Sequence, residues 1–361
     1  MKILHTEASC GWGGQEIRIL EESRGLIQRG HEVNVACPAH ARMATEAARF
    51  GVPVTTLPIE FKTVAGFRAL RRHLAEARPD VVNTHSSADS WLVALACAML
   101  PAPPAIVRTR HISAPVSGNF ANRWLYRQAR VVATTGESLR RHLLDTLGLD
   151  PERVTSVPTG IDPQRFAPTD KAAAKAALGL DPRQRHIGIV ATLRSWKGHL
   201  FLLDAFAQLN RPGLQLLIVG EGPMREPISE KIAALGLGDR VTLTGQRTDP
   251  ERWLQALDIF CLPSYANEGV PQAILQAMLC ALPIVTTPVG AILEAVSDNS
   301  SALVVAPRDA GALASAVGRL LDDPGLAAAL GATARRRASA DFSKDTMLDR
   351  MEAIFRQATS S

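Results

Sequence analysis

The sequence predicts an α/β protein made of two doubly wound domains, each with a parallel sheet covered by helices. Short apolar runs alternate with longer amphipathic stretches along the whole chain, which is the pattern of parallel strands joined by helices. This alternation breaks once, at a proline-rich segment between residues 157 and 168, and then resumes. A chain of 361 residues also favours two domains over one. We therefore predict a first domain over 1–165, a second over 166–340 and a final helix over 341–357.

The first domain is expected to open with a strand at residues 2–5. The amphipathic stretch 15–29 that follows predicts a helix, which would end at Gly30 because glycine suits a left-handed helix cap. Further strands of this domain are expected near residues 32–36, 53–57, 81–84, 105–109 and 131–134.

The second domain is expected to repeat this plan. Its strands are predicted near residues 187–191, 214–219, 241–243, 259–262, 284–286 and 302–305. Ligands of open parallel sheets bind at the carboxyl ends of the strands, so two such domains that face each other would form one cleft between them.

Composition excludes several classes of protein. The net charge of +5 is modest and the cations are spread along the chain, which does not favour nucleic acid as a partner. The five cysteines are odd in number, widely spaced and without a Cys-X-X-Cys pair, so neither a disulfide framework nor a zinc site is indicated. The most apolar run, 91–100, is about half of what a bilayer crossing needs. With an amino-terminal segment that soon turns polar, these features predict a cytoplasmic protein.

The stretch from Glu268 to Met278 has the strongest chemical signature. Gly269 permits a tight corner, and a helix beginning near Val270 would present backbone N–H groups that attract phosphate. Glu268 could accept hydrogen bonds from hydroxyls, and Gln276 lies two helical turns further on. One element could therefore contact sugar, phosphate and ribose.

Glycine-rich turns follow several predicted strands. Gly13, Gly14 and Gln15 come after the first strand, where glycines let a backbone approach a substrate closely. The spacing is not that of a dinucleotide fingerprint, and such a loop taken alone is equally typical of plain turn chemistry. Its place after a strand favours function, as do similar turns in the second domain. These turns contain Gly220, Gly222 and Gly245.

Arg194 and Lys197 follow the first strand of the second domain. Two cations at this spacing could meet the two negative charges of a diphosphate, although a solvated loop is the usual place for such residues.

His85 and His111 also follow predicted strands, but a lone histidine is more often structural than catalytic. No Asp-X-Asp, His-Glu-X-X-His or phosphate-binding Walker sequence is present, so neither a metal nor a cofactor is predicted.

A basic amphipathic helix is expected before the fourth strand. The simpler interpretation is a surface helix that packs its apolar side on the sheet, and the alternative is a patch that contacts anionic lipid headgroups. Its cations are Arg68, Arg71, Arg72 and Arg78.

Together these motifs resemble the GT4 family of retaining glycosyltransferases, which has the GT-B fold of two facing Rossmann-like domains with an interdomain cleft. The resemblance runs along nearly the whole chain. It rests on Gly13-Gly14, on Pro-X-Gly-Ile-Asp at 158–162, on Lys197-Gly198, on Gly-Glu-Gly-Pro at 220–223 and on Glu-Gly-X-Pro at 268–271.

The resemblance implies a role for each motif. It assigns Gly13 and Gly14 to the transferred sugar and its phosphates, His111 to the donor sugar, and the cations after the hinge, Arg194 and Lys197, to the diphosphate. It assigns Glu268 to the sugar hydroxyls and position 276 to the ribose. It also implies that the final helix crosses back to the first domain.

Two positions depart from the family pattern. The second glutamate of the family is Gln276 here, which keeps a hydrogen-bond acceptor but loses a charge. The usual arginine falls on Thr192 in ungapped register, so we assign its role to Arg194.

The resemblance implies a retaining, metal-independent transfer from a nucleotide diphosphate sugar to a saccharide or glycolipid hydroxyl. The expected setting is lipopolysaccharide or other cell-surface glycan synthesis at the cytoplasmic face of a bacterial membrane. Two alternatives stay open. A sugar-nucleotide epimerase on the same fold would convert the donor without an acceptor, and a non-catalytic nucleotide-sugar binding protein would not turn the donor over.

Overall fold

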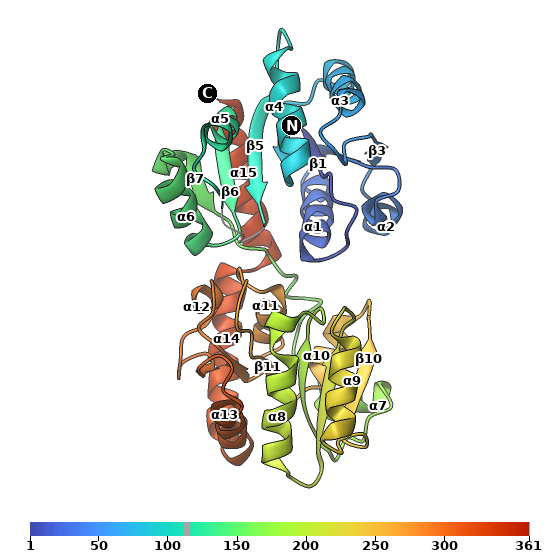
Figure 1. The fold of residues 1–361 in the computed structure, drawn as a ribbon, viewed down its shortest axis with the longest axis vertical. Coiled ribbons are helices and arrows are strands. Elements are labelled where there is room, and N and C mark those ends of the chain that lie inside the picture. The colour runs from blue at the N-terminus through green and yellow to red at the C-terminus, as the bar shows by residue number, and fades with distance from the viewer. Residues whose placement is uncertain (112–115, 361) are drawn as a thin grey trace. The chain divides into compact units, whose positions relative to one another are not determined.

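The computed structural model describes residues 1–111 and 116–360. The chain forms two compact units, which are Met1–Gly160 with Lys344–Ser361, and Ile161–Ser343 (Figure 1). The division therefore lies five residues before the predicted boundary at 165. Both units contain a parallel sheet flanked by helices, which confirms the predicted pair of Rossmann-like domains.

Unit 1 contains a seven-stranded sheet in the order β3-β2-β1-β4-β5-β6-β7, with every pair parallel. Its strands are β1 (Lys2–Thr6), β2 (Glu32–Cys37), β3 (Val54–Thr56), β4 (Val81–Thr84), β5 (Ala105–Arg110), β6 (Val131–Thr134) and β7 (Val154–Ser156). Because β1 pairs with both β2 and β4, the strand order reverses beside β1, where doubly wound sheets bind ligands. The short edge strand β7 was not predicted, since three residues carry too little pattern.

Helices cover both faces of this sheet. They are α1 (Gly14–Gln28), α2 (Arg42–Phe50), α3 (Val64–Ala77), α4 (Ser87–Ala98), α5 (Phe120–Gln128), α6 (Glu137–Leu147) and α15 (Lys344–Thr359). Alternate residues of one strand serve opposite faces. Ile3 packs with Met351 and Phe355 of α15, whereas Leu4 packs in the cluster that contains Leu70 of α3.

The final helix α15 belongs to unit 1 and packs against α1, β4, β5 and β6. Ion pairs join α15 to α1 and the residue that follows it. Lys344 Nζ lies 3.3 Å from Glu21 Oε2, and Arg29 Nη1 lies 2.7 Å from Asp349 Oδ1. The prediction of a helix from residue 341 was wrong at its start, because α14 (Pro324–Asp341) ends there and α15 begins at Lys344. The cause lies between the two helices, where Ile161 N donates to Phe342 O at 2.9 Å as the chain changes units.

Unit 2 contains a six-stranded parallel sheet in the order β10-β9-β8-β11-β12-β13. Its strands are β8 (Arg185–Val190), β9 (Leu214–Val219), β10 (Val241–Gly245), β11 (Ile259–Leu262), β12 (Ile284–Thr286) and β13 (Leu303–Val304). Its helices are α7 (Lys171–Ala177), α8 (His199–Leu209), α9 (Arg225–Ala234), α10 (Pro250–Ala256), α11 (Gln272–Leu279), α12 (Ile292–Ala295), α13 (Ala310–Asp322) and α14. The order reverses beside β8, which pairs with β9 and β11.

Within the described parts of the chain, no helix has the length and apolar character that a membrane crossing requires.

Candidate functional site

At the carboxyl ends of β8 and β11, Lys197 and Glu268 form an ion pair. Lys197 Nζ lies 2.7 Å from Glu268 Oε1 and 2.9 Å from Oε2. The carboxylate side chain is only 5% exposed and that of the lysine 18% exposed. The structure thus brings together two residues that the sequence assigned to different parts of a ligand, and it holds their charges largely away from water.

Ser264 completes this arrangement and was missed in the sequence. Its hydroxyl donates to Glu268 Oε1 at 2.6 Å, and its own backbone carbonyl accepts a hydrogen bond from Thr287 Oγ1. Ser264 is fully buried, two residues after the end of β11. A polar residue two positions after a buried strand was the available signal. Glu268 is therefore held by two donors, which fixes the direction of its carboxylate.

Gly290, after β12, supports the backbone of Glu268. Its φ is +61°, and a Cβ added there would lie 2.0 Å from Glu268 O. The neighbouring Ala291 N donates to the same oxygen at 3.2 Å. A side chain at position 290 would therefore displace the segment that carries Glu268.

We expect Gly290→Ala to destabilise unit 2 by about 2–4 kcal/mol, because it adds both a left-handed alanine and a backbone clash. Urea unfolding would measure this loss. Gly238→Ala is the matched control, since a Cβ there meets nothing within 4 Å. Equal stability of the two variants would contradict this account of Gly290.

The helix after Glu268 begins later than predicted. Pro271 is the residue that caps α11, with φ −72° and ψ 124°, and the first helical residue is Gln272 and not Val270. The extended ψ of Pro271 excludes it from the helix, although its carbonyl accepts hydrogen bonds from the N–H groups of Ile274 and Leu275. The side chain of Val270 is buried in the core of unit 2, so only its backbone could contact a ligand.

The remaining predicted residues of unit 2 lie near the same sheet edge. The packing of the protein itself requires glycine at positions 220 and 222, since Cβ atoms added to Gly220 and Gly222 would lie 1.9 Å from Ala191 O and 2.7 Å from Leu193 O. Gly245 ends β10 with φ +72°, Gly269 is half-buried beside Glu268, and Gln276 is half-buried on α11.

Arg194 is exposed, and its guanidinium carbon lies 5.7 Å from the ring centroid of Trp196. Among the described residues, no hydrogen bond or ion pair joins its side chain to Glu268. The structure thus places Lys197, but not Arg194, in contact with Glu268.

In unit 1, the glycine loop opens α1. Gly13 is the residue before the helix, and Gly14 is its first residue. Gln15 Nε2 donates to the carboxylate of Glu7, which also accepts from Ser9 N at 2.7 Å. The nearest atom to a Cβ added at Gly13 is Glu16 Oε2 at 3.7 Å, so the packing of the protein itself does not require glycine there.

Three histidines form a hydrogen-bonded column across β1, β4 and β5, beside the point where the strand order reverses. His5 Nδ1 lies 2.9 Å from His85 Nε2, and His85 Nδ1 lies 2.8 Å from His111 Nε2. The rings of His5 and His85 are stacked, with centroids 5.2 Å apart. The sequence singled out His85 and His111 separately, and it missed both their contact and His5. Neighbouring parallel strands bring together residues far apart in the chain, which no local spacing reveals.

Burial keeps this column neutral. It lowers the pKa of His5 to about 3. The pKa of His111 is also well below its ordinary value of 6.5, because of burial first and then the charges of Arg18 and His5. Burial, followed by the neighbouring histidines, does the same to the pKa of His85. Neutral imidazoles can both donate and accept, so the column can orient His111 through hydrogen bonds.

Two buried carboxyl groups lie close to the column. Asp89, in the first turn of α4, accepts hydrogen bonds from His85 N at 2.9 Å and Thr6 Oγ1 at 2.8 Å. Burial, and then the charge of Asp89, raises the pKa of Glu7 to about 8. A protonated Glu7 can therefore exist near neutral pH.

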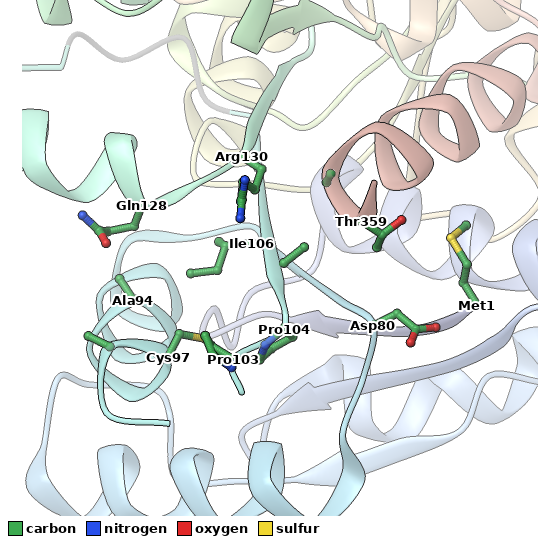
Figure 2. A pocket seen from close by; sticks show the side chains of 13 residues that line it. Met1, Asp80, Ala94, Cys97, Pro103, Pro104, Ile106, Gln128, Arg130 and Thr359 are labelled. Carbon is green, nitrogen blue, oxygen red and sulfur yellow. The ribbon is translucent and has the colours of Figure 1, made fainter. Parts of the chain in front are cut away.

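A cavity of about 630 Å³ in unit 1 lies at the opposite edge of the sheet (Figure 2). Its lining includes Asp80, Pro104 and Arg130, which immediately precede β4, β5 and β6 respectively. These are the amino ends of the strands, whereas doubly wound sheets bind ligands at the carboxyl ends. We therefore do not place the functional site there.

Two family models match the chain. Residues 12–165 match Glycosyltransferase Family 4, and residues 184–323 match Glycosyl transferases group 1. A D-inositol 3-phosphate glycosyltransferase of Nocardia farcinica is 31% identical over 86% of this chain and 77% of its own length. The chain belongs to glycosyltransferase family 4.

A second relative of this family 4 glycosyltransferase is a lipopolysaccharide core biosynthesis mannosyltransferase, LpsB, of Rhizobium meliloti. It is 34% identical over 54% of this chain and 58% of its own length. Among solved structures, Anabaena HepE in complex with UDP-glucose superposes with a TM-score of 0.83, over 98% of each chain at 21% identity. The superposition on HepE shows that the two proteins share a fold, and this fold agrees with the predicted GT-B class.

Proposed function

We propose that this enzyme transfers a sugar from a nucleotide diphosphate sugar to a hydroxyl acceptor with retention of anomeric configuration. The observation that carries the proposal is the ion pair between Lys197 and the buried Glu268 carboxylate at the strand reversal of unit 2. A cation held at this edge suits a diphosphate, and a fixed carboxylate suits sugar hydroxyls. The UDP-glucose bound by HepE supports a nucleotide sugar as donor.

In this reaction Lys197 stabilises charge that develops on the leaving diphosphate, with help from the helix end near Gln272. Glu268 accepts hydrogen bonds from the sugar, and Gln276 binds the ribose. Gly13 and Gly14 approach the transferred sugar and its phosphates, and His111 contacts the sugar. We assign no general base, because the leaving phosphate can take the acceptor proton on the same face of the sugar.

An NMR spectrum of the product tests retention directly. We expect the anomeric configuration of the donor to be kept, and an inverted centre would overturn the retaining mechanism.

We also propose that no metal is required, so full activity should persist after treatment with EDTA. Conversion of the donor without any acceptor would favour an epimerase, and a donor that binds without turnover would favour a binding protein.

Arg194 is proposed as the second cation for the diphosphate. Arg194→Ala is expected to raise the KM for the donor roughly 10-fold, since a charge-assisted hydrogen bond to phosphate is lost. Arg183→Ala is the control. Arg183 is exposed, pairs with Asp181 and precedes the amino end of β8, whereas Arg194 follows its carboxyl end. Unchanged donor affinity in Arg194→Ala would remove Arg194 from the site.

The proposed acceptor is a lipid-linked saccharide of lipopolysaccharide or another surface glycan, at the cytoplasmic face of the inner membrane. The name of the relative LpsB supports this setting. In unit 1, Arg68, Arg71 and Arg72 of α3 are exposed, as are Phe61 and Val64 at 65% each. Cations beside exposed apolar side chains suit an anionic lipid surface.

Arg71→Glu/Arg72→Glu is expected to abolish co-sedimentation with vesicles that contain anionic lipid, because each cation contributes about 1 kcal/mol near such a surface. Charge reversal at Arg335 and Arg336 on α14 gives a control of the same charge change. Binding to the vesicles that survives the α3 change would contradict a lipid-facing role for this helix.

A further inference from the structure

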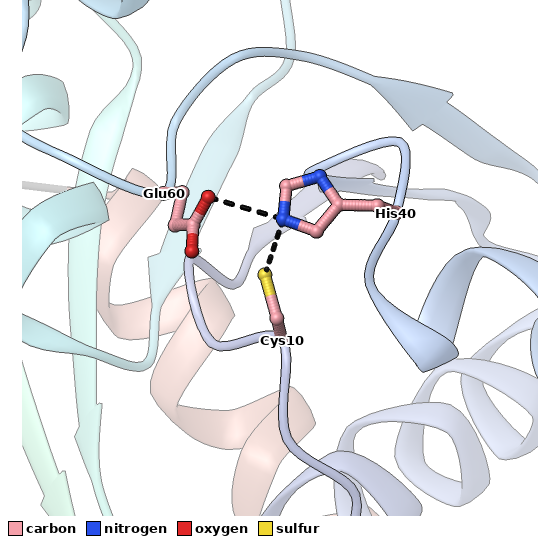
Figure 3. A group of neighbouring side chains, drawn as sticks. All are labelled: Cys10, His40 and Glu60. Carbon is pink, nitrogen blue, oxygen red and sulfur yellow. Dashed lines mark hydrogen bonds and ion pairs between the residues drawn. The ribbon is translucent and has the colours of Figure 1, made fainter.

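Cys10, His40 and Glu60 meet at one edge of unit 1, outside the residues assigned above (Figure 3). Cys10 follows β1, His40 follows β2 and Glu60 follows β3, and these three strands are neighbours in the sheet. Cys10 Sγ lies 3.3 Å and Glu60 Oε2 lies 3.1 Å from the same atom, His40 Nε2. Three separate loops thus aim a thiol, an imidazole and a carboxylate at one point.

These contacts do not form a catalytic cysteine triad. In such a triad the thiol and the carboxylate contact different nitrogens of the histidine. Here both reach Nε2, which carries either one proton or one lone pair. One of the two contacts at Nε2 therefore lacks a proton of its own, although the Cys10 thiol also reaches Glu60. A cation between the three groups would be bound by all of them.

We propose that Cys10, His40 and Glu60 bind a zinc ion, with one position left for water. Around a tetrahedral zinc with bond lengths of about 2.0–2.3 Å, ligand atoms are about 3.3–3.6 Å apart. The distances of 3.3 and 3.1 Å at His40 are close to this spacing. A thiolate and an imidazole favour zinc over magnesium or calcium, which prefer oxygen ligands.

The chain around the ligands fixes two of the three loops. Gly11 N donates to Ser9 Oγ at 3.1 Å beside Cys10, and the fully buried Ile59 anchors Glu60. His40 is exposed and can adjust. His40 and Glu60 also line a cavity of about 390 Å³, through which an ion could enter.

Bound zinc would restrain the glycine loop, because Gly11 follows Cys10 directly. This consequence rests on the proposed function, in which Gly13 and Gly14 approach the transferred sugar. Saturating zinc is then expected to lower the rate of transfer by the wild-type enzyme, and Cys10→Ser should abolish that inhibition. The binding experiment below needs no donor, so its failure is distinguishable from failure of the proposed function.

Titration of the full chain with Zn²⁺ and with Co²⁺ tests the site. We expect one ion per chain and, with Co²⁺, a sulfur-to-cobalt charge-transfer band. Cys10→Ser should remove the band, and Cys10→Ser, His40→Ala and Glu60→Gln should each weaken zinc binding at least about 100-fold, given that even outer-shell changes cost 10–100-fold. Glu32→Gln, at the other end of β2, is the control and should bind as the wild type does.

Thermal unfolding gives a second readout. Zinc should raise the unfolding temperature of the wild type and of Glu32→Gln, but not that of Cys10→Ser. Melting without metal checks that each variant folds. A cobalt band that survives Cys10→Ser, or zinc affinity unchanged in Glu60→Gln, would overturn the proposal, as would the absence of binding by the wild type.

Discussion

Lys197→Met is expected to lower kcat/KM for the donor roughly 10²–10³-fold, the range found when one charge-stabilising donor is removed from an active site. The reason is that Lys197 Nζ is the cation held at the strand reversal of unit 2, 2.7 Å from Glu268 Oε1. Initial-rate kinetics with saturating acceptor would measure the loss. Lys231→Met is the matched control, because Lys231 pairs with Asp204 at 2.7 Å on the half-exposed surface of the same unit.

The same change leaves the buried Glu268 carboxylate without its cation, although the Ser264 hydroxyl still donates to it, so it should also destabilise unit 2 by about 1–3 kcal/mol. The double variant Lys197→Met/Glu268→Gln separates the two effects. Removal of both charges is expected to restore stability, because a buried pair can often be replaced by neutral groups without loss. Activity should stay low. If activity returned together with stability, Lys197 would be a structural residue only.

The architecture could be predicted well from the sequence because local hydrophobic patterns determine most of its strands and helices. Each long strand of both sheets, such as β1, β4, β9 and β11, was found from an apolar run between amphipathic stretches. Errors occurred where the local pattern is weak. The edge strand β7 has three residues, and the junction at Phe342 is set by a hydrogen bond to Ile161, which lies far away in the chain.

The candidate site was predictable only in part, for the same reason. Glu268 and Lys197 could each be found from the strand that precedes them, but their ion pair joins residues 71 positions apart. The histidine column and the cluster at Cys10 likewise depend on strand order. Strand order in a parallel sheet is a long-range property, which composition and spacing do not encode.

The histidine column is expected to make unit 1 sensitive to acid. The pKa of His5 is about 3 in the folded protein, against an ordinary value of 6.5. Between these pH values the unfolded chain binds a proton that the folded chain does not. The stability due to neutral His5 is therefore fully present above pH 6.5 and is lost as the pH falls toward 3. His85 and His111 act in the same direction.

Glu7 acts in the opposite direction. Its pKa is raised from 4.5 to about 8, so the folded protein binds the extra proton between these values. The stability due to protonated Glu7 is present below pH 4.5 and is lost as the pH rises through 8. Between pH 4.5 and 6.5 Glu7 thus offsets part of the loss caused by the histidines.

Variants of the two groups should therefore change the pH dependence of stability with opposite sign. His5→Gln keeps a hydrogen-bonding side chain but does not titrate, so stability should fall less steeply between pH 6.5 and 4.5, by up to about 1.4 kcal/mol per pH unit. Glu7→Gln should make the fall steeper over the same range. Amide hydrogen exchange in β1, β4 and β5, corrected for intrinsic rates, reports unit 1 separately from unit 2. Parallel pH profiles for the wild type and His5→Gln would contradict a buried, neutral His5, since its proton uptake on unfolding requires the stability difference between the two proteins to change as the pH falls below 6.5.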